Sequence, residues 1–159
     1  MIVISDTTPL RYLTFLGMQD LLPRLFGRVH CQDAVIRECL HPKAPVILQK
    51  WAARTPAWLV VLAVPIIDGD LARLDDGEAA AITLARQLSA DVVLIDEQDG
   101  RRMAKSLGFT VAGTLNILAQ GGVRGWIDYA ETTTRLREET NFRATDALIL
   151  AAWENVAPR

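Results

Sequence analysis

The chain has 159 residues, of which 50% are hydrophobic and 23% charged, with a formal net charge of −2. This length suits one domain, expected over residues 1–159, and the apolar content excludes an intrinsically disordered chain. No apolar run approaches the ~18 residues of a membrane span, and the first residues lack the basic stretch of a signal peptide, so we expect a cytoplasmic protein.

The acidic balance also limits the possible partners and chemistries. Dedicated nucleic-acid binders are usually basic, so a nucleic-acid partner must be argued from a site and not from bulk charge. Cys31 and Cys39 match no zinc spacing, which predicts two buried free thiols in a reducing compartment. The sequence has no Gly-x-Ser-x-Gly elbow and no phosphate-binding glycine loop.

Short apolar strands alternate with helices in the first half of the chain. Residues 2–5 form an apolar run that ends at an acid, which predicts a buried strand. Thr8 before Pro9 predicts a helix cap, because Thr is a good N-cap and Pro suits the first helical position. The further elements expected here are helices over 19–26, 34–40 and 45–54 and strands over 28–32 and 58–64.

The same alternation continues in the second half. The clearest helix covers residues 75–88, where an acidic start leads into an alanine- and leucine-rich run. The apolar strand over 92–95 ends at Asp96. The remaining expected elements are a helix over 98–107, a strand over 109–111, a helix from Thr114 to 120 ended by Gly121-Gly122, and two helical pieces after 124 with a break near Asn141.

Short apolar strands between helices indicate a parallel sheet covered on both faces. In such sheets, ligands bind beyond the carboxyl ends of the strands. Asp6 and Asp96 both follow a strand directly. The sequence therefore predicts two acids at the functional edge of the sheet.

Glu78 is a third candidate, because of the helix face on which it lies. At 100° per residue it shares that face with Ala81, Ile82 and Ala85, on the core-facing stripe, where a lone charge is costly. A metal ion or a buried cation would remove this cost. The alternative is a capping box, in which Glu78 reaches back to the start of its helix.

The other acids also have structural alternatives. Asp6 could be a helix cap or a surface-loop acid, although Thr8 already fits the cap. Asp96 could cap the next helix, and Asp99 competes for the same cap or the same metal ion. Periodicity alone makes Glu38 a solvated helix residue.

Converging carboxylates need a compensating charge. Two of them ~5 Å apart repel by ~3 kcal/mol at an effective dielectric constant of about 20. Mg²⁺ or Mn²⁺ prefers oxygen ligands and supplies that charge. Such an ion can activate water for in-line displacement at phosphorus, and it lets an acidic site accept a polyanion.

Four segments resemble, in order, the motifs of PIN-domain nucleases. They are Val3-Ile4-Ser5-Asp6-Thr7-Thr8-Pro9-Leu10, Val35-Ile36-Arg37-Glu38-Cys39-Leu40, Gly77-Glu78-Ala79-Ala80-Ala81-Ile82 and Leu94-Ile95-Asp96-Glu97-Gln98-Asp99-Gly100. The Gly-Glu-x-x-Ala-Ile helix and Gly113-Thr114-Leu115 are most similar to a PIN subfamily related to VapC toxins.

The chain departs from the commoner VapC pattern at three places. Glu78 stands where that pattern has Asp, and Ile95-Asp96 replaces a Thr-x-Asn lead, which leaves open whether Asp96, Asp99 or both hold metal. Thr145-Asp146 mimics the usual third motif but comes last in the chain, so we interpret Asp146 as a helix cap.

The resemblance implies an α/β fold, namely a three-layer α/β/α sandwich around a parallel sheet of four or five strands. It implies Mg²⁺- or Mn²⁺-dependent endonucleolytic hydrolysis of RNA. Asp6, Glu38, Glu78 and Asp96 would hold the ion and orient water, with Thr7 and Asp99 as auxiliary residues. It also implies a toxin restrained by a cognate antitoxin protein, and a homodimer.

Two other functions remain open from the sequence. One is a catalytically inactive PIN-type binding module, against which the presence of all four acids argues. The other is a phosphatase or phosphotransfer receiver with Asp6 as nucleophile, although Thr8 stands where haloacid-type phosphatases have a second Asp. Arg11, Arg101 and Arg102 are candidates for phosphate contacts, and solvated helix arginines are the alternative.

Overall fold

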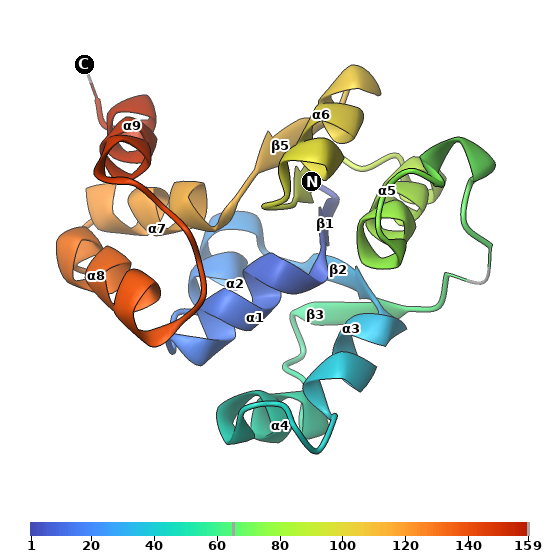
Figure 1. The fold of residues 1–159 in the computed structure, drawn as a ribbon, viewed down its shortest axis with the longest axis horizontal. Coiled ribbons are helices and arrows are strands. Elements are labelled where there is room, and N and C mark those ends of the chain that lie inside the picture. Colours follow the sequence, from blue (N-terminus) through green and yellow to red (C-terminus); the bar gives the residue numbers. More distant parts are fainter. Residues whose placement is uncertain (65, 159) are drawn as a thin grey trace.

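The computed structural model describes residues 1–64 and 66–158, and in this part of the chain five strands form one sheet (Figure 1). Their order is β3-β2-β1-β4-β5, and every neighbouring pair is parallel. The strands are β1 (Val3–Ser5), β2 (Val29–Gln32), β3 (Leu59–Leu62), β4 (Val92–Leu94) and β5 (Thr110–Ala112). The predicted parallel α/β sheet is confirmed, with five strands.

Helices connect the strands and continue after the last one (Figure 1). They are α1 (Thr7–Phe15), α2 (Leu21–Phe26), α3 (Asp33–Cys39), α4 (Val46–Ala53), α5 (Asp76–Leu88), α6 (Gln98–Ser106), α7 (Thr114–Val123), α8 (Tyr129–Glu139) and α9 (Asp146–Val156), with a 3-10 turn at Gly69–Leu71. Most agree with the expected ranges to within two residues.

The two faces of the sheet build separate cores, because successive strand residues point to opposite sides. Val3 of β1 packs in one core with Leu10 of α1, and that core also takes buried residues from α2, α7 and α8. Ile4 packs in the other core with Leu84 of α5. A smaller core joins α5 to α6 through Ile82 and its neighbours. The sheet is therefore the middle layer between two sets of helices.

The central strands β1 and β4 bring the predicted acids to one edge. Ser5 is paired with Leu94 in the register of the two strands. The chain leaves β1 at Asp6, whose backbone N–H donates to the carbonyl of Leu94 at 2.9 Å. Asp96 follows two residues after Leu94, so both acids lie at the carboxyl end of the sheet.

The start of α1 differs from the expectation. Thr8 was expected as the cap, and the structure instead begins the helix at Thr7, with Asp6 in the N-cap position. Pro9 then lies in the first turn, where its missing N–H has no intrahelical partner to lose. Sequence preference placed the cap two residues too late because Thr and Pro fit several positions of a first turn.

The prediction that Gly121-Gly122 ends α7 is wrong, because the helix continues to Val123. Both glycines are needed for close packing. A Cβ on Gly121 would lie 2.9 Å from a methyl carbon of Leu21, and one on Gly122 would lie 2.8 Å from both the Trp153 ring and the Cβ of Tyr129. These glycines therefore let α2, α8 and α9 approach α7.

The C-terminal part forms two helices with the expected break, residues 140–145. The cap of α9 is Thr145, whose hydroxyl accepts from the N–H of Leu148 at 3.1 Å. Asp146, which we interpreted as the cap, is the first helical residue and pairs with Arg137 at 2.7 Å.

Two further expectations concern the cysteines and the membrane. Cys31 and Cys39 are buried and free, as predicted, and burial raises the pKa of Cys31 to about 12. Among the described residues, none of the helices combines the length and the apolar character that crossing a bilayer requires.

Candidate active site

Asp6 is a buried acid whose side chain does not cap the helix that follows it. It is 4% exposed, and its side chain makes no capping hydrogen bond within the described part of the chain. One carboxylate oxygen, Oδ1, is buried and has no hydrogen-bond partner among the described residues. The helix-cap alternative for Asp6 therefore has no support from the geometry, although the residue stands in the cap position.

Burial raises the pKa of Asp6 to about 7. The backbone N–H of Thr7 acts in the opposite direction, and the negative charges of Asp75, Asp96 and Glu38 raise the pKa further. The charges that act on Asp6, which follows β1, thus come from α3, from the start of α5 and from the second residue after the end of β4.

Glu78 is the second buried acid, also 4% exposed. Its backbone N–H donates to Oδ1 of Asp75 at 2.8 Å, which caps α5. Burial raises the pKa of Glu78 to about 7, Asp75 and Asp6 raise it further, and the backbone N–H of Asp75 lowers it. The capping geometry and the position beside Asp6 therefore coexist.

Two glycines make room for these acids. A Cβ on Gly77 would lie 3.3 Å from Oδ1 of Asp6. A Cβ on Gly100 of α6 would lie 3.3 Å from Cδ of Glu78 and 2.5 Å from a side-chain carbon of Ile95. The backbones of α5 and α6 can thus approach the two carboxyl groups without a clash.

Asp96 is partly buried and anchors α7. Its Oδ1 accepts from the N–H of Thr114 at 2.8 Å, and its Oδ2 accepts from the Thr114 hydroxyl at 2.7 Å. Burial raises the pKa of Asp96, whereas the Thr114 donors and the Arg101 charge lower it. Asp96 does not cap α6, whose N-cap is Glu97, so it joins the sheet edge to α7.

The remaining predicted residues differ in their placement. Thr7 is buried beside Asp6, in the first turn of α1. Glu38 is exposed on α3, and its charge acts on Asp6. Asp99 lies on the solvent side of α6, with an 84% exposed side chain 3.9 Å from Arg102. The charges of Asp96 and Glu38 therefore act on Asp6, and that of Asp6 acts on Glu78, whereas Asp99 faces solvent.

Two acids near the site were not among the candidates. Asp75 raises the pKa of both Asp6 and Glu78, and Glu97 raises that of Glu78. Asp75 caps α5 and so belongs to the capping box that the sequence offered as the alternative role of Glu78. Glu97 had a signal, because it directly follows Asp96 at the end of a strand.

Two hollows adjoin these acids, and we name them by their chemistry. The aromatic hollow, of about 470 Å³, includes Arg11, Tyr12, Phe15, Glu97 and Asn141. The cationic groove, of about 450 Å³, is lined by Asp96, Gln98, Arg101, Arg102, Lys105, Gly113, Leu115, Asn116, Phe142, Arg143, Leu148, Ala151, Ala152 and Asn155. Asp96 lines the cationic groove, and its sequence neighbour Glu97 lines the aromatic hollow.

The acids have the donor chemistry of a site for a hard divalent cation. Carboxylate oxygens are the ligands that Mg²⁺ and Mn²⁺ prefer, and Oδ1 of Asp6 is buried without a partner. Within residues 1–64 and 66–158, no three His, Cys, Asp or Glu side chains are arranged so that they could hold a metal ion as they stand.

Comparison with known proteins gives one family. A family model described as a PIN domain matches residues 2–157, which is nearly the whole chain. No curated protein matches the chain.

Proposed function

Because the chain belongs to the PIN-domain family, whose members are typically metal-dependent nucleases, we propose that it is a Mg²⁺- or Mn²⁺-dependent endoribonuclease. The observation that carries the proposal is the pair of buried carboxyl groups of Asp6 and Glu78. Burial raises the pKa of both groups, Asp75 raises both further, and Asp6 raises that of Glu78. Oδ1 of Asp6 has no partner among the described residues. Buried like charges of this kind are costly unless a cation or a proton joins them.

Each acid would contribute to ion binding from a different part of the fold. Asp6 and Glu78 supply carboxylate oxygens from the sheet edge and from the first turn of α5. Thr114 holds the carboxylate of Asp96 with two hydrogen bonds, which fixes its direction while leaving lone pairs free. Glu38 contributes from the exposed side, where solvent and substrate have access.

The bound ion would activate a water molecule and neutralise charge that develops on the phosphate. Thr7 supports the charged form of Asp6 through its backbone N–H. With two of the acids buried, the ion rather than the bulk charge of −2 would make the site acceptable to a polyanion.

The toxin role is a finer part of the same proposal. It is supported by the resemblance of the Glu78 helix and of Gly113-Thr114-Leu115 to the VapC-related subfamily. On this reading the protein acts in the cytoplasm, forms a homodimer and is restrained by a cognate antitoxin.

A catalytically inactive binding module is the second candidate. The observation that favours it is that the described acids are not arranged as a ready three-ligand cluster. The two candidates differ in whether Mn²⁺ binds and whether RNA is cut.

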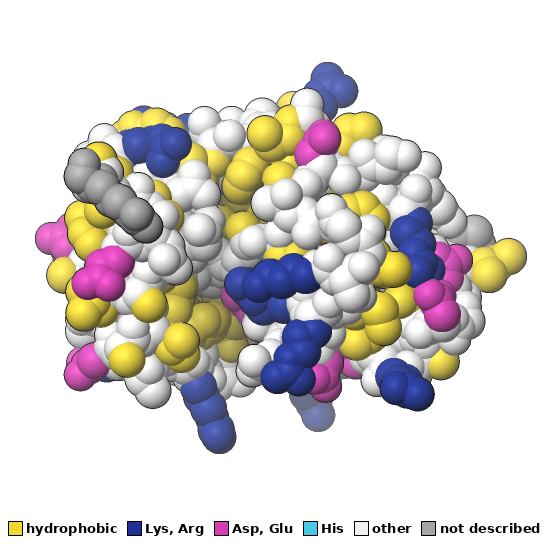
Figure 2. All heavy atoms as spheres, turned by 90° about the horizontal axis from the view of Figure 1, so that it is seen from above, with side chains coloured by type: hydrophobic (Ala, Val, Ile, Leu, Met, Phe, Trp, Pro, Cys, Tyr) yellow, Lys and Arg dark blue, Asp and Glu magenta, His cyan; other side chains and the backbone are white. Residues whose placement is uncertain are grey.

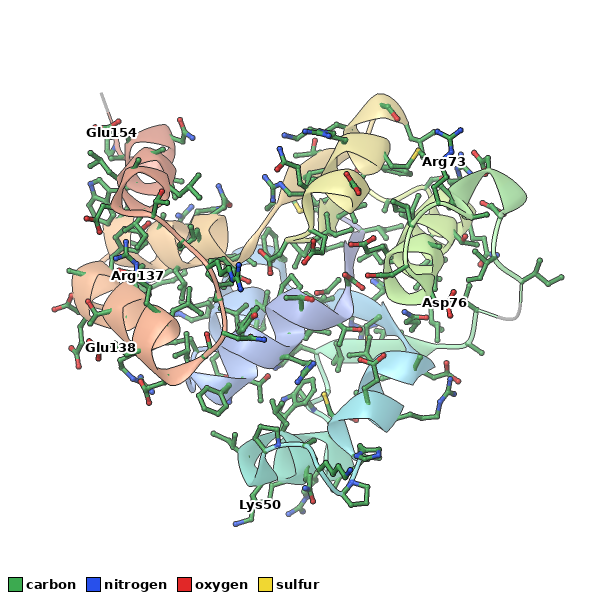
Figure 3. The ribbon with its side chains drawn as sticks, viewed as in Figure 1. Lys50, Arg73, Asp76, Arg137, Glu138 and Glu154 are labelled. Carbon is green, nitrogen blue, oxygen red and sulfur yellow. The ribbon has the colours of Figure 1, made fainter. Side chains whose placement is uncertain are left out.

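Cleavage of a labelled single-stranded RNA in Mn²⁺ or Mg²⁺ tests the proposal, with wild type, Asp6→Asn and Glu78→Gln compared. We expect wild type to cut internally and each variant to lose at least ~100-fold in rate, since removing one charged ligand typically costs several kcal/mol. Glu138→Gln is the matched control, because Glu138 is exposed on α8, away from α5 (Figure 3). Equal rates for Asp6→Asn and wild type would contradict the proposal.

A further inference from the structure

The cationic groove lies between α6, α7, α9 and the segment between α8 and α9. Asp96, one of the candidate acids, is among its lining residues, so the groove reaches the candidate active site at Asp96. It is formed by parts of the chain that are far apart in sequence.

The groove concentrates positive charge in a chain whose net charge is −2. Arg101, Arg102 and Lys105 come from α6, where Arg101 and Lys105 are one turn apart and share a face. Arg143 comes from the segment before α9. Among the lining residues that the structure describes, Asp96 is the one acid, so the groove beyond it is positive.

Two of these cations are free to bind a ligand. Arg101 donates to the carbonyl of Ile95 at 3.0 Å, and Arg102 lies 3.9 Å from exposed Asp99, so each has an interaction already. Lys105 and Arg143 are exposed, and neither makes a salt bridge with any described residue. Figure 2 shows Lys and Arg side chains gathered near the middle of the face seen from above, beside a hollow.

The rest of the lining is apolar or carries amides. Gln98, Asn116 and Asn155 can hydrogen-bond to bases or sugars, and Leu148 and Phe142 offer apolar surface. The ring of Phe142 packs edge-on against Tyr12, with centroids 5.1 Å apart, which fixes its orientation. Single-stranded nucleic acid is bound by cations that contact its phosphates and by aromatic or apolar surface that contacts its bases, and the groove has both.

We propose that the cationic groove binds the sugar–phosphate backbone of a single-stranded polynucleotide next to the cleavage site, with Lys105 and Arg143 as its main phosphate contacts. The inference rests on the proposed nuclease function, because that function places a phosphodiester at Asp96. An acidic protein segment is the alternative occupant, and the test below separates the two.

The test is fluorescence anisotropy of a labelled 12-nucleotide RNA, and of DNA of the same sequence, in EDTA and in Ca²⁺. Wild type is compared with Lys105→Gln, Arg143→Gln and the double variant. Each single change is expected to weaken binding about fivefold near 0.1 M salt and to reduce the slope of log K against log salt by ~0.7, the value for one phosphate contact on a single strand. Equal affinity for RNA and DNA would mean that the groove contacts phosphates alone. A preference for RNA would mean that it also contacts the ribose 2′-hydroxyl. Both results would support the proposal.

The matched controls are Lys50→Gln and Arg54→Gln, which remove the same charges from the region of α4. Lys50 lies on the opposite side of the molecule from α6 and α9 in Figure 3. Both controls are expected to bind RNA like wild type. Loss of affinity that is equal in controls and groove variants would show only a bulk charge effect and would overturn the proposal.

Three further results would also overturn it. The first is that wild type and the double variant have equal RNA affinity and equal salt slope. The second is that wild type binds no RNA in either EDTA or Ca²⁺. The third is that wild type binds an oligoglutamate peptide but not RNA. The outcome is independent of cleavage. Groove-dependent binding by a wild type that cuts nothing in Mn²⁺ would end the nuclease proposal and leave the groove as the polynucleotide-binding surface of a binding module. Cleavage without groove-dependent binding would keep the nuclease proposal and end this one.

Discussion

At the scale of single residues, the defining feature is a pair of carboxyl groups that are more deeply buried than their charge favours. Asp6 and Glu78 are each 4% exposed. The pKa of each is raised to about 7, chiefly by burial. Near pH 7 the two carboxyl groups of the metal-free site are therefore partly protonated. A divalent cation would favour their charged form.

These raised pKa values predict how stability depends on pH. Between the ordinary values of 3.8 and 4.5 and the folded values of about 7, the folded protein holds more protons than the unfolded chain. Stability therefore falls as pH rises through this range. We expect metal-free protein to lose about 5 kcal/mol, or roughly 15 °C in Tm, between pH 5 and pH 8, measured by thermal unfolding in EDTA.

The same argument predicts the effect of removing the charge. Asp6→Asn replaces a buried acid with a neutral group of similar shape, so it is expected to flatten the pH dependence and to stabilise the metal-free protein at pH 8 by about 1 kcal/mol. Thermal unfolding of variant and wild type in EDTA measures this. An Asp6→Asn protein that is less stable than wild type at pH 8 would instead assign Asp6 a structural role.

Thr114 is expected to act through Asp96. Thr114→Val removes the hydroxyl that donates to Oδ2 and leaves the backbone donor to Oδ1, at a cost of about 1–2 kcal/mol in unfolding free energy. Mn²⁺ affinity should also fall, because Asp96 loses its fixed direction. Thr114→Ser retains the hydroxyl and should restore affinity, whereas a failure of Ser to restore it would mean that the methyl group matters instead.

At the scale of elements, the glycines of α7 show how packing overrides local preference. In an exposed helix, Gly→Ala gains about 1 kcal/mol. At Gly122 the added carbon would lie 2.8 Å from Trp153 of α9 and from Tyr129 of α8. We therefore expect Gly122→Ala to destabilise the protein by about 1–3 kcal/mol in denaturant unfolding.

Gly69→Ala is the matched control for that prediction. Nothing described lies within 4 Å of a Cβ at Gly69, and its backbone conformation is ordinary for an L-residue. This change should be neutral or slightly stabilising. Equal effects of the two substitutions would mean that α7 is not held by close contact with α8 and α9.

The strands and most helices follow from local sequence, because apolar runs and helix caps are short-range signals. The errors have long-range causes. Gly121 and Gly122 interact with Leu21, Tyr129 and Trp153, which no local window contains. The cap of α1 was misplaced because several polar residues fit one first turn, and the position of Asp6 was settled by its backbone bond to β4.

At the scale of the whole molecule, the sheet order explains why the candidate acids converge. β1 lies in the centre, beside β4, so the acids that follow these strands share an edge although 90 positions separate Asp6 from Asp96. Strand-end acids alone pointed to this edge. The placement of Glu38 needed the resemblance to PIN domains, because helix periodicity made it a solvated residue.

Other parts of the site could not be inferred from sequence. Asp99 was a reasonable candidate by spacing, and only the rotation of α6 shows that it faces solvent. The cationic groove joins α6 to Arg143 of a distant segment, so no linear charge pattern reveals it. The fold was thus more predictable than the site, because side-chain direction depends on how whole elements pack.

The central claim is that the acids around Asp6 form a binding site for a divalent cation, and titration calorimetry with Mn²⁺ tests it most directly. We predict that wild type and Glu138→Gln bind Mn²⁺ with protons released at pH 7, since binding requires charged carboxylates. Folded Asp6→Asn should bind at least ~10-fold more weakly. Equal Mn²⁺ affinity for wild type and Asp6→Asn, or no binding by wild type even with RNA present, would contradict the account.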